Sequence, residues 1–370
     1  MPPAHRLILL PLLLLGLGAA CSKGPAFGSD NAIVAVIDPR VREMLEPLVR
    51  GALEREVFTT RSERVFEVTI TTPAEIGDFR KWARLLVIEP LQDPTLVPDL
   101  VGDADGPVFA RVEDEWARDQ TVWVIAAPTP EATVELASAR LDSVYRAFHD
   151  AWVEHQVERM WASEPDSAGA RRMAEELGFS IVIPQVYRPA SSSAPPDTRT
   201  WYNEDPRRVL SLHWGSAPPD LTAERVLAAR RDWGATLFPG DGIAGSLPGD
   251  TAGVAAEAGS AAGRAEEEDA AEDAAAESAA PGDTAPSGDA VAPPMLLASR
   301  TTLGGLPAVR LQGVWENRSD LTSGLFLTYG VACGDRLVLL DGNLYAPDRD
   351  KYAYLLQFER IFETFRCGSR

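Results

Sequence analysis

The sequence predicts a mixed fold, with an N-terminal α/β layer that includes a long helix and a C-terminal antiparallel sheet packed against helices. Up to about residue 163, short β-branched runs alternate with helical patterns, which is typical of an α/β layer. After residue 295, apolar residues recur at every second position of the expected strands, which is typical of antiparallel strands. A length of 370 residues suggests about two domains, each able to bury a core.

The N-terminal elements follow in order. Ala32–Ile37 is a β-branched apolar run and predicts a buried strand, and Asp38 and Pro39 then begin a helix over Val41–Arg55. Further strands are expected at Val65–Thr71, Leu85–Glu89 and Val122–Ala127. Gln92–Pro107 contains prolines and acids and predicts a surface loop. The longest helix is expected over Pro130–Ser163, where aromatic and aliphatic residues recur at helical spacing.

The C-terminal elements begin with a helix capped by Asp166 and ended by Gly178. A helix is also expected at Leu221–Trp233, and a last one from Pro347 or Asp348 to Arg366. Strands are expected at Phe179–Ile183, Arg199–Tyr202, Val209–Trp214, Val309–Glu316, Leu325–Val331 and Leu337–Tyr345. Their alternation predicts a sheet with one buried face, on which the last helix packs, and one wetter face.

The N-terminus has the pattern of an export signal. A basic start, an apolar run over Leu7–Leu17 and three small residues lead into Cys21. We therefore expect residues 1–20 to be a lipoprotein signal peptide, Cys21 to carry lipid such as palmitate, and residues 21–30 to form a flexible tether. Gly18 stands where lipoprotein signals usually have Leu, so a secreted protein with a free Cys21 is the alternative. Ser22 favours the outer membrane, with the protein facing the periplasm.

The charge is strongly acidic and unevenly distributed. A net charge of −20 disfavours nucleic acid and anionic membrane surfaces as partners. Residues 244–294 hold eleven acids and one base, and the rest of the segment is mostly Ala, Gly, Ser, Thr and Pro. Such a segment cannot bury enough surface to offset its ordering entropy. The predicted domains are therefore 31–163 and 164–243 with 295–370, separated by a disordered acidic insertion at 244–294.

Few residues offer chemistry. The sequence contains no nucleophile elbow, phosphate loop or dinucleotide turn, and we assign no catalytic residue, metal or cofactor. His213 is the best single candidate for a base, although we favour a solvated residue on the polar face of a strand. Asp341 precedes Gly342 and is either a buried carboxylate or, as we favour, part of a bulge or turn.

Two cysteines remain once Cys21 carries lipid. Cys333 ends a predicted strand, and Cys367 follows the last helix, which is expected to lie on the same sheet. In an oxidising compartment we expect a disulfide between them, the alternative being two small apolar residues near a sheet edge.

Several segments together resemble a known family. The signal cysteine, Leu177–Pro184, Gly313–Glu316 and Leu340–Pro347, in this order and spacing, are similar to a family of uncharacterised bacterial lipoproteins defined by a domain of unknown function. The resemblance covers most of the chain after the signal except the acidic insertion, and it implies no activity, cofactor or catalytic residue.

Two functional hypotheses follow. We favour a non-enzymatic, lipid-anchored envelope protein, attached to the membrane by its N-terminal lipid, that binds an envelope protein or ligand or has a structural role. The alternative is an envelope hydrolase built around His213 or Asp341 in a cleft between the two halves.

Overall fold

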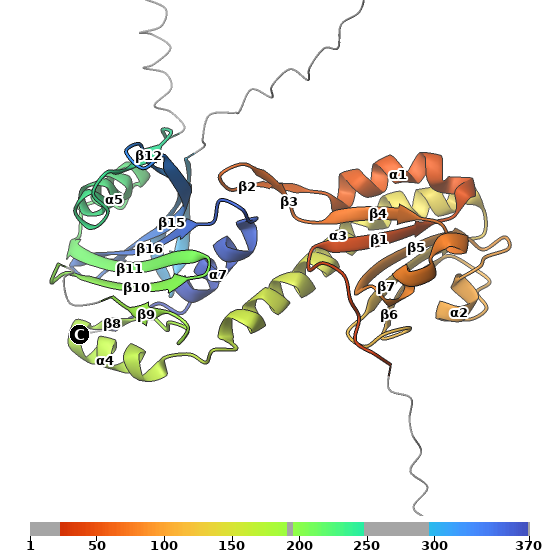
Figure 1. Cartoon of the computed structure of the whole chain (residues 1–370), viewed down its shortest axis with the longest axis horizontal. Coiled ribbons are helices and arrows are strands. Elements are labelled where there is room, and N and C mark those ends of the chain that lie inside the picture. The colour runs from red at the N-terminus through yellow and green to blue at the C-terminus, as the bar shows by residue number, and fades with distance from the viewer. Residues whose placement is uncertain (1–22, 191–194, 248–295, 369–370) are drawn as a thin grey trace, which may run out of the picture. The chain divides into compact units, whose positions relative to one another are not determined.

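The computed structural model describes residues 23–190, 195–247 and 296–368, and the chain divides into two units (Figure 1). The first unit comprises the described residues up to Glu54 together with Phe66–Tyr145, and the second comprises Arg55–Val65 and the described residues from Arg146 onward. The division therefore falls inside the long helix, before the boundary expected at residue 163. The predicted fold class is confirmed, with a mixed sheet in the first unit and an antiparallel sheet in the second.

The first unit is a five-stranded sheet in the order β4-β1-β5-β7-β6, in which the first four strands are parallel and β6 is an antiparallel edge. Its elements are β1 (Ala32–Ile37), α1 (Pro39–Leu53), β4 (Glu67–Thr71), the 3-10 turns Pro73–Glu75 and Gly77–Lys81, β5 (Arg84–Pro90), α2 (Val97–Val101), β6 (Val108–Glu113) and β7 (Thr121–Ala127). Helix α3 (Pro130–Trp161) begins in this unit and ends in the second. All six residues of β1 are buried, which explains their unbroken apolar character.

Two expectations about the first unit were wrong. The segment predicted as a surface loop contains α2, because the buried carboxylate of Glu89 accepts hydrogen bonds from the backbone N–H groups of Leu96 (2.9 Å) and Val97 (3.0 Å) and so caps the helix. Residues 24–27, which lie in the predicted flexible tether, are hydrogen-bonded to this unit. Backbone N–H groups of Ala26 and Phe27 donate to the carbonyls of Arg118 (2.7 Å) and Lys81 (3.0 Å).

The second unit is built on an eight-stranded antiparallel sheet in the order β12-β14-β15-β16-β11-β10-β9, with β13 also paired to β14. The strands of this sheet are β9 (Arg188–Pro189), β10 (Thr198–Glu204), β11 (Arg207–Ser216), β12 (Asp241–Ala244), β13 (Leu297–Leu303), β14 (Leu306–Asn317), β15 (Thr322–Cys333) and β16 (Arg336–Tyr345). A separate two-stranded sheet pairs β8 (Phe179–Ser180) with β17 (Arg366–Cys367). The helices of the second unit are the end of α3, α4 (Ser167–Leu177), α5 (Ala223–Leu237) and α7 (Tyr352–Phe362).

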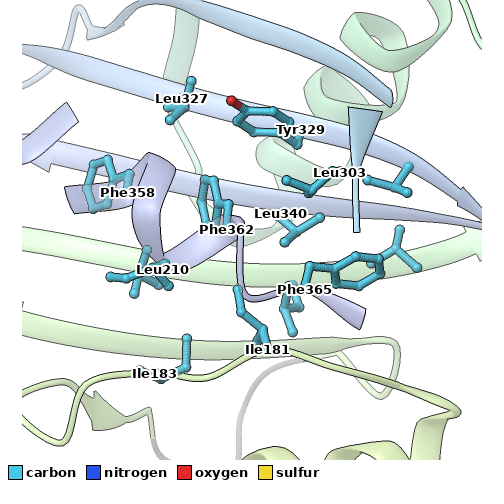
Figure 2. Packing of buried hydrophobic residues seen from close by; sticks show 14 of the residues in the cluster. Ile181, Ile183, Leu210, Leu303, Leu327, Tyr329, Leu340, Phe358, Phe362 and Phe365 are labelled. Carbon is cyan, nitrogen blue, oxygen red and sulfur yellow. The ribbon is translucent and has the colours of Figure 1, made fainter. Parts of the chain in front are cut away.

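The sheet of the second unit is covered on both faces. One face carries Leu325, Leu327 and Leu340 and packs against Phe358 and Phe362 of α7 (Figure 2). The opposite face carries Val309, Leu311, Phe326 and Leu339 and packs against Val226, Leu227 and Trp233 of α5. The prediction that one face of this sheet is more exposed to water is therefore wrong, because α5 covers that face. Strands β14 and β15 also direct their alternating apolar residues to opposite faces. In the register, Leu311 is opposite Thr328, so Leu311 shares a face with a polar residue of β15 and not with Leu325 and Leu327.

Two glycines let these helices approach the sheet. A Cβ on Gly330 would lie 2.6 Å from the Val226 side chain of α5, and one on Gly342 would lie 2.7 Å from the Phe358 ring of α7. Because such distances are far inside van der Waals contact, each helix can pack at its observed depth only on glycine.

The acidic insertion leaves and rejoins the chain at one edge of the sheet. Ala244 of β12 pairs with Val314 and Leu297 of β13 pairs with Gln312, so both ends lie along the same edge of β14. Ala244 and Leu247 are buried, which corrects the expected start of the insertion at residue 244. Residues 248–294, and with them the predicted disorder, lie outside the described residues.

A hairpin, β2 (Glu56–Phe58) and β3 (Ser62–Arg64), also belongs to the second unit. Its buried Glu63 carboxylate accepts hydrogen bonds from the backbone N–H groups of Lys351 (2.7 Å) and Tyr352 (3.1 Å) at the start of α7. Lys351 provides no side-chain cap of its own, so a residue distant in sequence satisfies the N-terminus of this helix.

Candidate functional site

Both weak candidates from the sequence lie on the sheet face that α5 covers. In the register, Asp341 of β16 is opposite Ser211 of β11, and His213 is opposite Leu339. Because cross-strand partners point to the same face, the side chains of Asp341 and His213 share one face with Ser211. Sequence reasoning treated the two residues separately, and only the strand pairing brings them together.

Asp341 is a fully buried carboxylate in the middle of a regular strand, so the expected bulge or turn was wrong. Its Oδ1 lies 2.7 Å from Nε of Arg230 on α5, and the side chains of Thr328 and Asn343 also donate to the carboxylate. The guanidinium of Arg230 lies 3.8 Å above the Phe326 ring. This carboxylate is therefore fully engaged by an ion pair and hydrogen bonds.

His213 is half-buried rather than solvated as expected. Its ring stacks on Trp233 of α5 at 5.5 Å between centroids, and Nδ1 lies 3.1 Å from the carbonyl oxygen of Asp197. Burial lowers the pKa of His213, and the nearby Asp197 carboxylate opposes that shift only in part. The imidazole is therefore neutral at pH 7, because its ordinary pKa is already about 6.5.

Ser211 does not form a nucleophile–base pair with His213. The Ser211 hydroxyl oxygen lies 3.3 Å from the Thr200 hydroxyl, and the hydrogen bonds of the His213 ring are with Asp197 and Thr198. Asp341, His213 and Ser211 thus each have hydrogen-bond partners beneath α5, an arrangement that fixes the position of α5 on the sheet.

A cavity, which we call the α4 cavity, lies between α4 and β10 in the second unit. Its volume is about 580 Å³, within the range of about 300–1,000 Å³ typical of small-molecule pockets. Its floor is formed by the buried side chains of Met173, Ile181, Ile183 and Tyr187, together with the half-buried Trp201. Its rim is polar, with Asp166, Arg172, Glu176, Gln185 and Arg199.

The α4 cavity combines the features expected of a binding site. The apolar floor can take an apolar or aromatic group, and the rim offers both positive and negative charges to a polar end. One rim carboxylate is already committed, because Asp166 Oδ1 accepts a hydrogen bond from the backbone N–H of Gly169 (2.8 Å) as the α4 cap. Neither His213 nor Asp341 lines this cavity.

Sequence reasoning missed Arg230 and the α4 cavity. Val226, Arg230 and Trp233 lie three and four residues apart, so an arginine stands within the apolar stripe of α5. That position, and the alternation of Asp341 with Asn343, were available signals for a buried ion pair. The α4 cavity has no such signal, because its lining comes from segments that only the fold brings together.

The structure places the remaining predicted residues as follows. Cys21 lies outside the described residues. Cys333 and Cys367 are joined by a disulfide with a Cα–Cα distance of 5.8 Å, within the range that a disulfide requires. Among the described residues, no group of three or more His, Cys, Asp or Glu side chains is arranged to hold a metal ion. None of the described helices is both long and apolar enough to span a membrane.

Two family models match the chain. Residues 26–161 match a domain of unknown function (DUF8532), and residues 267–364 match another domain of unknown function (DUF4837). Matches to uncharacterised domains in both halves agree with the resemblance to an uncharacterised family. No curated protein matches the chain.

Solved structures give only distant similarities. Cyanobacterial PsbP (CyanoP) from Synechocystis sp. PCC 6803 is 11% identical, with a TM-score of 0.30 over 51% of this chain and 86% of that one. LpqN, involved in cell envelope biogenesis of Mycobacterium tuberculosis, is 13% identical, with a TM-score of 0.23 over 52% and 83%. A Bacteroides thetaiotaomicron structure is 8% identical, with a TM-score of 0.27 over 52% and 46%. Similarities at this level assign neither fold nor function to this chain.

Proposed function

We propose that this protein is a lipid-anchored, non-enzymatic protein of the cell envelope that binds an amphiphilic small molecule in the α4 cavity. The single observation that carries the proposal is the cavity itself, about 580 Å³ with an apolar and aromatic floor and a charged rim. The ligand class follows from that lining, because an apolar body matches the floor and a polar end matches the rim.

The envelope location is supported by the sequence of residues 1–21 and by the disulfide. Disulfides persist in oxidising compartments outside the cytoplasm, and the pair Cys333–Cys367 has suitable geometry. Lipid on Cys21 would hold the protein at the membrane, at the outer membrane if Ser22 directs sorting. The alternative of a hydrolase loses support because Arg230 engages Asp341 and α5 covers His213.

Binding can be tested with 8-anilinonaphthalene-1-sulfonate, a fluorescent probe with an aromatic body and an anionic end. Ala170 lines the cavity, so Ala170→Phe should fill part of it and weaken probe binding by about fivefold or more. Ala168→Phe, on the exposed side of the same helix, is the matched control and should bind like the native protein. Equal binding by the two variants would exclude the α4 cavity as the site.

The anchor has a separate test. Cys21→Ala should leave the precursor unprocessed or release the protein into the aqueous phase of a detergent partition, whereas the native protein should enter the detergent phase. Unchanged partitioning of the variant would show that Cys21 carries no lipid.

Photo-crosslinking in the native envelope from Gln185, at the rim of the α4 cavity, would identify what occupies the cavity.

A further inference from the structure

A second cavity lies beneath α5, on the opposite face of the sheet from α7. Its volume is about 200 Å³, more than one water requires and less than a drug-sized ligand occupies. The lining comes from α5, β12, β14 and β16, and consists of Arg230, Arg231, Gly234, Phe238, Asp241, Gly242, Ile243, Trp315 and Asn343. We call it the α5 cavity.

Arg230 brings a fixed, incompletely used guanidinium to this cavity. Its Nε binds Asp341 and Thr328, and its Nη2 binds Asn343 Oδ1 at 3.0 Å and Asp341 Oδ2 at 3.5 Å. Its Nη1 has no partner among the residues that the structure describes, although Arg230 is 95% buried. Because the side chain is held from two sides, by Asp341 and by the Phe326 ring, Nη1 can meet a ligand with little loss of side-chain freedom.

Apolar side chains form part of the lining beside this guanidinium. Phe238 and Ile243 provide apolar wall, and the Trp315 ring also lines the cavity. The indole nitrogen of Trp315 is enclosed by protein, so this residue offers the cavity an aromatic surface.

The charges around the α5 cavity limit the ligand's own charge. The charge of Arg230 is matched by Asp341, and the cavity lining adds one further cation, Arg231, and one anion, Asp241. The Asp241 carboxylate accepts a hydrogen bond from Asn317 Nδ2 at 2.9 Å, so it is already partly satisfied. One guanidinium nitrogen without an acceptor and a near-neutral surround fit a monoanion better than a dianion such as phosphate.

We propose that the α5 cavity binds a small monocarboxylic acid with a short apolar or aromatic body. Its carboxylate accepts hydrogen bonds from Arg230 Nη1, and its body lies against Phe238, Ile243 and the Trp315 ring. This site goes beyond the proposed function, because it differs from the α4 cavity in its lining, size and ligand class.

Ligand-observed NMR with the full-length chain in detergent tests the proposal, with benzoate as the probe and benzamide as its neutral isostere. We expect benzoate to bind about tenfold more tightly than benzamide, because charge-assisted hydrogen bonds are the stronger ones. Gly234→Met should abolish benzoate binding by filling the cavity, since no atom lies within 4 Å of a Cβ placed there. Ala235→Met, on the exposed side of α5, is the matched control and should retain binding.

The proposal is overturned if native protein shows no benzoate binding up to about 10 mM, if benzamide binds equally well, or if Gly234→Met binds like Ala235→Met. Ala170→Phe should leave benzoate binding unchanged, so failure of this site and failure of the α4 cavity are distinguishable.

Discussion

Asp341 and Arg230 form a buried ion pair between the middle of β16 and the inner face of α5, with Oδ1 and Nε 2.7 Å apart and side-chain exposures of 0% and 7%. The two residues are 111 positions apart in the sequence. An ion pair of this kind contributes more to the placement of α5 than to net stability, because desolvation offsets much of the attraction.

Breaking this pair from one side should be costly. Arg230→Met leaves the Asp341 carboxylate buried without its cation and should lower the free energy of unfolding by about 3–5 kcal/mol. The double variant Arg230→Met/Asp341→Leu should recover much of that loss. Arg231→Met, next to it on the exposed side of α5, should change stability by less than about 0.5 kcal/mol. Urea denaturation measures all three, and a loss below about 1 kcal/mol for Arg230→Met would contradict the role of the pair.

The boundaries of the acidic insertion can be tested by two deletions. Removing residues 248–294 and joining the ends by a short Gly-Ser linker should change the melting temperature by less than about 2 °C, because the ends lie along the same edge of β14. Removing residues 244–294 also takes away the buried Ala244 and Leu247, and should lower it by several degrees. Calorimetry compares the two, and similar melting temperatures would contradict the new boundary.

The disulfide should stabilise the second unit. It closes a loop of 34 residues, which in the chain-entropy model corresponds to roughly 3–4 kcal/mol. It also joins β15 to β17, the short strand that pairs with β8 next to α4. The variant Cys333→Ser/Cys367→Ser should therefore unfold at lower urea concentration. Alkylation of unfolded protein without reductant should label neither cysteine, and labelling of both would show that the bridge is absent in solution.

Stability should depend on the protonation of His213. Because burial lowers the pKa of His213 in the folded state, the unfolded chain takes up this proton first as the pH falls. Native protein should therefore lose stability relative to His213→Gln as the pH falls from about 7.5 to about 5.5, through the unfolded value of about 6.5. His149, whose pKa burial also lowers, is present in both proteins and cancels in the difference. Urea denaturation at several pH values measures this difference, and a constant or opposite trend would refute the assigned environment.

The sequence by itself determined the fold class and most of the elements. An unbroken apolar run marked strand β1, whose six residues are all buried, and alternation of apolar and polar residues marked much of β14. Because both faces of the second sheet are covered, β15 and β16 are buried along most of their length, and their alternation is broken at Phe326 and at Leu337–Leu340. The same local patterns marked the caps of α4 at Asp166 and Gly178, where neighbouring backbone groups settle the outcome. The sequence also placed Cys333 at the end of a strand and Cys367 after the last helix, and these positions predicted the disulfide that joins them.

Only the tertiary structure decided what lies on each face of the sheet. The period of a strand says which side chains share a face and not what covers that face, so His213 was expected in water although α5 lies over it. Asp341 likewise carries no local sign of its partner, because Arg230 approaches from a different helix. Both cavities are bounded by segments separated in sequence, so their volume and charge exist only after the sheet and its helices have packed.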